Sequence, residues 1–552
     1  MMGKTGYILA LLLLIAYVAE AKGGPRIGKT SVRGVWLTTN YGLDWPSRRA
    51  TTPAQAEAQK AELCRLLDMA EAMNLNTVFF QARVRSDVLY ESEYEGYSSV
   101  LTGVYGRKPQ YDPLAFAVEE CRRRGLQCHV WIVCMNIGKE SEIKKRGKNS
   151  LPVKHPEICT RYKGEWYLNP GVPATGDYLA AIAGEIVSRY DVDGIHLDYI
   201  RYPDRAADFP DKKEYSRYAP SGMSLKEWRI NNINAIVGKI YDRVKACDST
   251  VMVSSAVLGK RDNLPDYPSF GWSGIEAAFQ DAAAWLEAGK MDFIAPMIYY
   301  ADASFYPFLK DWIENSGGYP VAAGLGAYRL SPDGGDWSLD DFMRQISIGR
   351  EFGAAGEVYY RMKQLSENVK GLGLVLAPAF NAVPALFPPI KNAPGEPLPP
   401  PQCLSVKQGA VEKAVSWPGV KGAKYYTLYA SDVYPVDTDD ARNILVPATT
   451  DTICTVNAEY QYYAVTATDG YYRESSAVSQ KKGALCFSEG ERVLLPAESD
   501  GGCRRIQISD STGEVVYRGF CDEAAIRALR RGAYVMKMTC KDKVEYYSLI
   551  IN

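Results

Sequence analysis

Eight short apolar runs rich in β-branched and aromatic residues recur between positions 30 and 362 of this 552-residue chain. Helical patterns separate most of them, and the clearest spans residues 54–73, where Ala58, Ala61 and Leu66 share one stripe. The runs cover residues 32–38, 76–83, 127–133, 194–201, 251–257, 293–300, 320–327 and 356–361, and further helices are expected at 178–190, 225–244 and 339–352. Strands alternating with helices in this way predict an α/β fold, a (β/α)8 TIM barrel. An open doubly wound sheet is the alternative, but the glycine-rich phosphate turn typical of it is missing after the early strands.

The first 21 residues have the pattern of a secretory signal peptide. Lys4 precedes an apolar run over residues 7–18, and Ala19-Glu20-Ala21 fits a small-residue cleavage site. Twelve apolar residues are too few to cross a bilayer, and no later stretch reaches the ~18 residues of a membrane span. The first cysteine is Cys64, which argues against a lipid anchor near the N-terminus. We therefore expect an exported protein that resides in the periplasm, on the cell surface or in the medium.

Prolines between positions 384 and 401 predict where the barrel ends. They place a barrel at residues 28–388 and a stiff linker at 389–401. Residues 402–482 alternate like a small β-sandwich and are similar to a fibronectin type III domain, in which Trp417 would be the early-strand tryptophan. Residues 483–552 are similar to a type IX secretion C-terminal sorting domain, which would make the secretion machinery a partner. The alternative for this segment is a third structural domain.

Charge and composition exclude several classes of function. The 64 Lys and Arg residues balance 65 Asp and Glu residues, so no general attraction to nucleic acid or to an anionic membrane is expected. Only three histidines occur, which argues against a His-rich zinc site, and neither a metal nor another cofactor is expected. The 38 tyrosines suit sugar stacking and ordinary cores equally well.

Strand parity selects candidate residues for a site at the barrel mouth, the C-terminal ends of the strands with their following loops. In the fourth run Ile195 and Leu197 face the helices, so His196 and Asp198 face inward. An inward carboxylate such as that of Asp198 costs several kcal/mol unless it is paired or used. His196 is a candidate for binding a sugar hydroxyl or orienting Asp198. The same reasoning adds further substrate-binding candidates, which are Gln81, Arg83, Trp131, Tyr299 and Arg361, and Arg201 joins them from the end of the fourth run. Each has a structural alternative: a histidine of an inner layer, an arginine paired with a carboxylate, or a ring that fills the barrel.

Three segments carry a family resemblance. Residues 32–38 (VRGVWLT), 76–83 (NTVFFQAR) and 190–203 (YDVDGIHLDYIRYP) resemble the glycosyl-hydrolase-like family 10, supported by residues 101–103, 129–131 and 168–171. The resemblance covers about residues 31–380. It implies a (β/α)8 barrel and action on peptidoglycan glycan strands that lack stem peptides. The DGIHLD segment is also similar to the fourth strand of the α-amylase superfamily, which implies that Asp198 is a nucleophile.

The chain departs from the family pattern at three places. Asp198 is followed by Tyr199 where many members carry a second Asp. Residues 296–299 (PMIY) lack the amide of the usual Pro-Gln-Ile-Tyr, and residues 133–136 (VCMN) replace Asn-Pro-Tyr-Arg. These changes leave a second carboxylate unassigned. Asp302 and Glu357 are the first candidates for it, followed by Asp87 and Asp204.

Two functions of different classes follow. The first is an exported glycoside hydrolase that uses Asp198, because glycoside hydrolysis needs a pair of carboxyl groups around the scissile bond. The alternative is a barrel of the cell envelope that binds glycans without cleaving them, which the missing second Asp favours. A metal-dependent deacetylase is disfavoured because it needs clustered His and Asp ligands.

Overall fold

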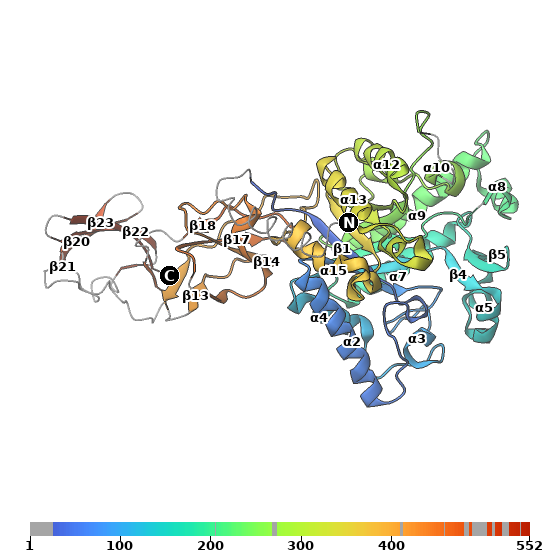
Figure 1. Cartoon of the computed structure of the whole chain (residues 1–552), viewed down its shortest axis with the longest axis horizontal. Coiled ribbons are helices and arrows are strands. Elements are labelled where there is room, and N and C mark those ends of the chain that lie inside the picture. Colours follow the sequence, from blue (N-terminus) through green and yellow to red (C-terminus); the bar gives the residue numbers. More distant parts are fainter. Residues whose placement is uncertain are drawn as a thin grey trace, which may run out of the picture. The chain divides into compact units, whose positions relative to one another are not determined.

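A computed structural model shows eight parallel strands closed into a barrel, with helices around the outside (Figure 1). The strands run around the barrel in the order β1-β11-β10-β9-β8-β7-β3-β2. Their bounds are β1 Val32–Leu37, β2 Thr77–Arg83, β3 Gln127–Val133, β7 Gly194–Asp198, β8 Met252–Leu258, β9 Phe293–Met297, β10 Ala322–Leu325 and β11 Gly356–Tyr360. Each run expected from the sequence forms one of these strands. The predicted (β/α)8 architecture is confirmed.

The structure describes residues 26–204, 206–267, 273–408, 412–457 and 459–479. Within the last 70 residues it describes 485–487, 505–510, 514–520, 529–530, 532–540 and 543–551. The expected signal peptide at residues 1–21 lies outside the described residues and stays a prediction. Among the described residues, we find no helix whose length and apolar character would let it cross a membrane.

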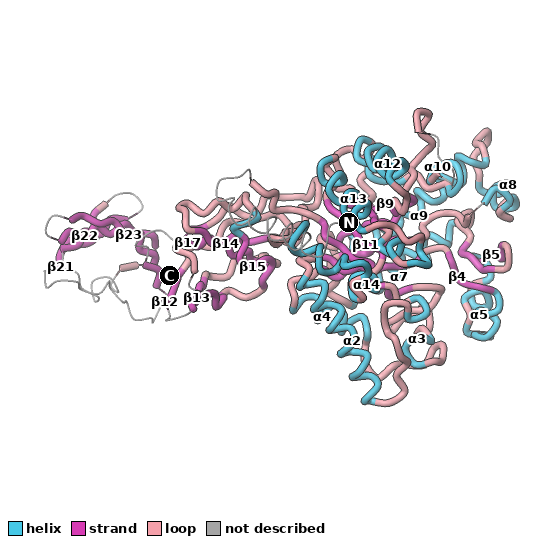
Figure 2. The backbone as a smooth tube through the Cα atoms, in the orientation of Figure 1, coloured by secondary structure: helices cyan, strands magenta, loops and turns pink. Residues whose placement is uncertain are grey.

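One main helix follows each strand, and Figure 2 shows these helices outside the strands. Their bounds are α2 Pro53–Ala72, α4 Pro113–Arg123, α7 Pro173–Arg189, α9 Leu225–Cys247, α11 Ala282–Glu287, α12 Asp302–Glu314, α13 Leu339–Glu351 and α14 Met362–Ser366. Local chemistry sets where two of them begin. Before α2, the Thr52 side chain accepts from the backbone N–H of Gln55, and the Gln55 side chain accepts from the backbone N–H of Thr52. Ser224 and Glu227 form the same pair of hydrogen bonds before α9. Helix α7 begins five residues before its expected start because Pro173 suits the first turn.

The two faces of the strands pack differently. Leu37, Phe80 and Leu197 face outward into a core shared with the helices. Trp36 and Phe79 face inward, where their ring centroids lie 5.9 Å apart. Side chains therefore alternate along each strand between the barrel interior and the helices. The inward side chains at the strand ends line the mouth.

Loops after the strands add structure around the mouth. After β3, the strands β4 (Asn136–Lys139), β5 (Cys159–Tyr162) and β6 (Glu165–Leu168) form a sheet of order β4-β6-β5. Short helices in the loops and after the barrel are α3 Ser99–Thr102, α5 Glu140–Arg146, α6 Leu151–Lys154, α8 Lys212–Tyr218, α10 Gly274–Ala278 and α15 Leu372–Val375. The sequence patterns did not predict the β4-β6-β5 sheet, which brings Glu165 and Tyr167 into consideration below.

Contacts divide the chain after Ala393 into two compact units. The second unit contains a sheet of β12 (Ser405–Gln408), β13 (Glu412–Ser416) and β16 (Ile453–Asn457), and another of β15 (Ile444–Thr449), β14 (Tyr425–Ser431), β17 (Tyr462–Thr468) and β18 (Val478–Ser479). Trp417, Val415 and Leu428 lie in their shared core. The likeness to a fibronectin type III domain stays a prediction, as do the expected boundaries at residues 388, 401 and 482.

The last five strands form a sheet of order β19-β23-β22-β20-β21. Their bounds are β19 Leu485–Phe487, β20 Arg505–Asp510, β21 Val515–Phe520, β22 Gly532–Cys540 and β23 Lys543–Ile551. Neighbouring strands of this sheet are antiparallel except β19 and β23, which are parallel. The likeness to a sorting domain stays a prediction.

Candidate active site

Asp198 is the last residue of β7 and is buried at the barrel mouth, with 4% of its surface exposed. Its Oδ2 accepts from Nε1 of Trp131 at 3.0 Å, and its Oδ1 accepts from the backbone N–H of Tyr199 at 2.7 Å. Burial raises the pKa of Asp198 to about 6, although the nearby Arg201 and these two hydrogen bonds act in the opposite direction. The site therefore holds a carboxyl group that changes charge near neutral pH.

Trp131 and Tyr199 fix the position of this carboxylate. Trp131 is on β3, the neighbour of β7 in the barrel, and pairs in register with His196. Its indole N–H is thereby directed at the residue that ends β7. Tyr199 adopts a left-handed backbone conformation with φ of 50°, unusual for a residue with a large side chain, and turns its N–H to Asp198.

His196 lies inside the barrel and belongs to its packed interior. Its Nε2 accepts from Nε1 of Trp36 at 3.0 Å, so Nδ1 carries the proton and donates to Oγ of Ser254 at 2.8 Å. Burial lowers the pKa of His196 well below its usual range, which keeps the ring neutral. Both nitrogens are engaged inside the barrel. The geometry therefore favours the alternative of an inner-layer histidine over direct contact with a sugar.

Tyrosines form one wall of the mouth. Tyr299 follows β9, and its ring lies 5.7 Å from Tyr360 in a stacked arrangement and 5.6 Å from Tyr328 edge-on. Burial raises the pKa of Tyr299 well above its usual range, with smaller contributions from Tyr360 and then Asp198. Tyr199 is 42% exposed next to Asp198. These rings offer apolar faces and hydroxyl groups, the combination that suits a sugar.

Gln81 lies near the end of β2, two residues before Arg83. Its Oε1 accepts from Oγ1 of Thr38 at 2.7 Å and from the backbone N–H groups of Thr39 and Asn40, each at 3.0 Å. Three donors on one oxygen fix the amide orientation. Among the described residues, no acceptor is hydrogen bonded to Nε2 of Gln81, which leaves two N–H donors for a ligand.

Arg83 is held by partners inside the protein. It is fully buried and donates from Nε and Nη2 to the two oxygens of Glu95, at 2.8 and 2.6 Å. Its Nη1 donates to the backbone oxygens of Val133 and Cys134. Glu95 also accepts from the hydroxyl of Tyr178 at 2.9 Å. Substrate binding was the expected role of Arg83, but the geometry favours a structural ion pair.

The parity expected for the last strand is reversed in the structure. Val358 and Tyr360 face the interior, and Tyr360 contacts Trp36, whereas Glu357 and Tyr359 face the helices. Glu357 is the second residue of β11 and accepts from Nε of Arg350 on α13 at 2.6 Å. This position, away from the mouth, argues against a role as catalytic acid.

Arg361 lies at the mouth end of β11 but has a protein partner. Its Nη1 donates to Oδ1 of Asp44 at 3.1 Å, and the Asp44 carboxylate also accepts from the backbone N–H groups of Thr38 and Lys363. Burial raises the pKa of Asp44 to about 6, against the effect of Arg361. The pair ties the loop after β1 to the end of β11, and substrate contact by Arg361 stays a prediction.

The other carboxylate candidates lie in different surroundings. Asp302 is the first residue of α12, and its side chain lies outside what the structure describes. Asp87 is paired with Arg146 at 2.8 Å. Asp204 is exposed, with Oδ1 3.9 Å from Nη2 of Arg201.

Glu165 on β6 is a further carboxylate that the sequence did not suggest. Its Oε2 accepts from Asn136 and from the hydroxyl of Tyr167, each at 2.9 Å. Tyr167 has its pKa raised by burial first, then by Glu165, and to a smaller extent by Asp204. The loops after β3 and β7 thus bring Glu165 and Asp204 within electrostatic range of one tyrosine.

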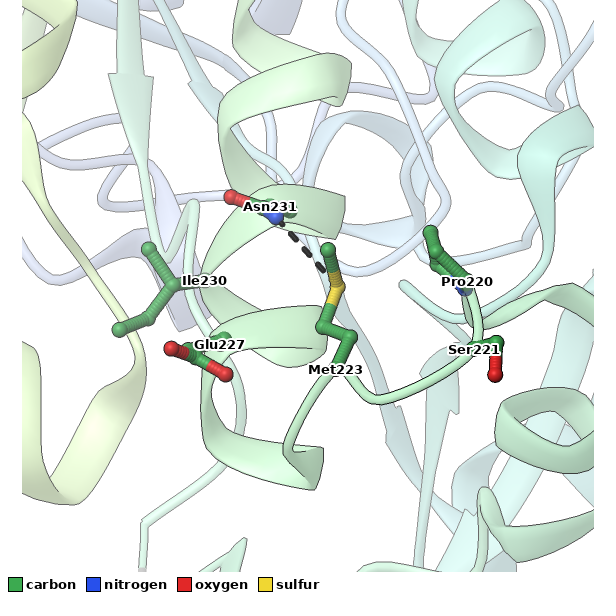
Figure 3. Close-up of a pocket in the computed structure, with 6 residues that line it drawn as sticks. All are labelled: Pro220, Ser221, Met223, Glu227, Ile230 and Asn231. Carbon is green, nitrogen blue, oxygen red and sulfur yellow. Dashed lines mark hydrogen bonds between the residues drawn. The ribbon is translucent and has the colours of Figure 1, made fainter.

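The pocket in Figure 3 is separate from these residues. It has a volume of about 480 Å³ and is lined by Pro220, Ser221, Met223, Glu227, Ile230 and Asn231, from the start of α9 and the loop before it. Nδ2 of Asn231 points at Sδ of Met223, 3.6 Å away. None of the expected site residues lines it. In the part of the chain that the structure describes, no group of three or more His, Cys, Asp or Glu residues could hold a metal ion.

Comparisons with known proteins give the chain a family and several relatives. The family described as Glycosyl hydrolase-like 10 matches residues 31–315. The protein named glycosyl hydrolase YngK, from Bacillus subtilis, is 29% identical over 478 residues, which cover 81% of this chain and 92% of that protein. Glycosyl hydrolase DigH of Escherichia coli is 30% identical over 303 residues, covering 51% of this chain and 69% of that protein. Among solved structures, the glycoside hydrolase domain of PgaB (BpsB) from Bordetella bronchiseptica has a TM-score of 0.43 at 15% identity and covers 63% of this chain and 99% of that one.

Proposed function

Because the chain belongs to the glycosyl hydrolase-like 10 family and is a glycoside hydrolase, we propose that it is exported and cleaves glycan strands of peptidoglycan. The substrate is proposed from the resemblance described above, whose bacterial members act on strands stripped of stem peptides. One structural observation supports the chemistry: the carboxyl group of Asp198 is buried at the mouth of the barrel and held by two hydrogen bonds.

Asp198 is the group that we assign to the charged transition state. When a glycosidic bond breaks, positive charge develops on the sugar ring, and an ionised carboxylate stabilises it or attacks the anomeric carbon. Its oxygens are already oriented by Trp131 and by the backbone N–H of Tyr199, so little reorganisation is needed as the charge develops. Tyr299, Tyr328 and Tyr360 supply the faces on which sugars stack, and Nε2 of Gln81 donates to a hydroxyl.

The second carboxyl group is proposed to come from the loops beside Asp198. It must protonate the leaving oxygen or activate water. Asp204 and Asp302 were named from the sequence, and the structure adds Glu165, whose hydrogen bonds to Asn136 and Tyr167 orient it. Glu357 and Asp87 are bound by arginines.

On glycan strands freed of stem peptides, we expect cleavage whose kcat/KM rises as pH increases through about 6, because Asp198 must lose its proton to act. Trp131→Phe removes a donor that lowers the pKa of Asp198, so the rise should move to higher pH. Trp285→Phe is the matched control, since that indole donates to Asn234 on α9, outside the mouth. Failure to cleave these strands would refute the proposed substrate. If kcat/KM rose at the same pH in Trp131→Phe as in the wild type, Asp198 would not be the group whose ionisation causes the rise.

Export is proposed from the pattern of residues 1–21. If it is correct, the mature chain begins near Lys22. Mass spectrometry of the protein purified from the cell envelope or the medium measures this directly. Recovery there of a chain that still carries Met1 would contradict cleavage by a signal peptidase.

A further inference from the structure

Arg201 is buried beside Asp198 with donor groups that nothing in the described protein satisfies. Only 5% of the residue is exposed, yet Nε and Nη1 have no hydrogen-bond partner among the described residues. Nη2 lies 3.9 Å from Oδ1 of the exposed Asp204, beyond hydrogen-bond distance. Most buried donors in proteins are paired, and leaving them unpaired is unfavourable. The guanidinium group of Arg201 is therefore prepared for a partner outside the described protein.

The surroundings of Arg201 place that partner in the candidate active site. Arg201 follows Asp198 by three residues, and its positive charge acts to lower the pKa of that carboxyl group. Its guanidinium carbon lies 4.2 Å from the centroid of the Tyr199 ring, which fixes the plane of the guanidinium group. The carboxylate of Asp198 accepts from Trp131 and Tyr199, and among the described residues it accepts no hydrogen bond from Nε or Nη1 of Arg201.

We propose that Arg201 binds a carboxylate carried by the glycan, so that the site selects acidic sugars over neutral ones. This inference rests on the proposed glycoside hydrolase function and specifies its substrate class. A planar guanidinium group with two unpaired nitrogens matches the two oxygens of a carboxylate. The contrast with Arg83 supports the assignment, because the fork of Arg83 is already filled by both oxygens of Glu95. Uronic acids and sugars with an ether-linked lactic acid both carry such a group.

The test compares each acidic glycan with its carboxyl-reduced form. We expect wild-type kcat/KM to be about 10- to 100-fold higher on the acidic form, the size of a charge-assisted hydrogen bond. Arg201→Gln should remove this preference, because cleavage of the acidic glycan should fall further than cleavage of the reduced one. Since the charge of Arg201 also lowers the pKa of Asp198, the proteins are compared above about pH 8, where Asp198 is ionised in both. Arg217→Gln, an exposed arginine on α8, should behave like the wild type. Parallel assays on a polyuronate and on peptidoglycan glycan distinguish the two sources of the carboxylate.

Two results would overturn the inference: equal cleavage of acidic and reduced glycans by the wild type, or an equal loss on both with Arg201→Gln. A readout independent of cleavage is binding of glucuronic acid and N-acetylmuramic acid, against N-acetylglucosamine, followed by NMR. Selective binding of an acidic sugar that is abolished in Arg201→Gln supports the inference even if no glycan is cleaved. An absence of cleavage would refute only the proposed function. A melting temperature measured for each variant separates a lost contact from misfolding.

Discussion

Replacing Asp198 with asparagine is expected to lower the rate of glycan cleavage by about 10³-fold or more, the scale of losing a preorganised electrostatic partner of the transition state. Asparagine keeps the shape of the side chain but carries no charge. It can neither attack the anomeric carbon nor stabilise an oxocarbenium-like ion as a carboxylate does. The measurement is kcat on any glycan that the wild-type protein cleaves.

The same substitution should not lower the stability of the folded chain, although it lowers activity. Because the pKa of Asp198 is raised to about 6 in the folded chain, the folded state holds a proton that the unfolded state releases between about pH 4 and 6. The wild type therefore loses stability as pH rises through this window, by up to about 3 kcal/mol for a shift of roughly two pKa units. Asp198→Asn lacks this loss, and at pH 7 we expect it to melt no lower than the wild type.

Asp177→Asn is a matched control, because Asp177 is an exposed residue on α7 that pairs with Lys239. It should keep full activity. Near-full activity of Asp198→Asn on a substrate that the parent cleaves would refute the catalytic assignment. If the wild type cleaved no glycan, and Asp198→Asn bound glycans as tightly as the wild type, the results would favour a glycan-binding barrel instead.

Glu95→Gln is expected to destabilise the folded chain by about 3–5 kcal/mol, the usual effect of removing one partner of a buried ion pair. The Arg83 side chain is fully buried and that of Glu95 is 1% exposed, so the substitution leaves the guanidinium charge without its counter-ion. The Arg83 pKa, which burial alone would lower, is raised above its usual range because Glu95 lies beside it. Chemical denaturation followed by tryptophan fluorescence measures the change.

An exposed pair serves as the comparison for Glu95→Gln. Lys108 and Glu91 lie 2.7 Å apart with more than half of each side chain exposed, and Glu91→Gln should leave stability nearly unchanged. If Glu95→Gln does not fold, the double variant Arg83→Met with Glu95→Leu removes both charges and should recover much of the loss. A wild-type denaturation midpoint for Glu95→Gln would contradict the structural role and return Arg83 to the substrate-binding candidates.

Several features followed from the sequence because they depend on local periodicity. A strand with Ile195 and Leu197 on its outer face must turn His196 and Asp198 inward, since successive side chains alternate across a strand. Asp198 ends that strand, so its position at the mouth followed once the alternating strands and helices indicated a barrel. The proline-rich segment predicted a linker at residues 389–401, and the structure divides the chain after Ala393.

Parity failed where the pattern itself does not alternate. Val358, Tyr359 and Tyr360 are all apolar or aromatic, so either face of the last strand could have been the inner one. The structure resolves this because Val358 and Tyr360 fit the barrel interior, while Glu357 meets Arg350 on a helix outside it. Tyr360 was therefore missed as part of the aromatic wall. Tyr328 was missed because it lies in a short helix after β10, where strand parity does not apply.

The sequence by itself determined the eight strands, four of the helices between them and the inward direction of Asp198, because covalent geometry sets which side chains share a face. Only the tertiary structure decided which partner each polar group has. Arg83 and Glu95 are 12 positions apart, and His196 meets Trp36 across 160 positions. Nothing in a local pattern encodes such pairs. They form because closing the barrel removes water from these groups, and each buried donor or charge must then be satisfied by whatever the neighbouring strands and loops present.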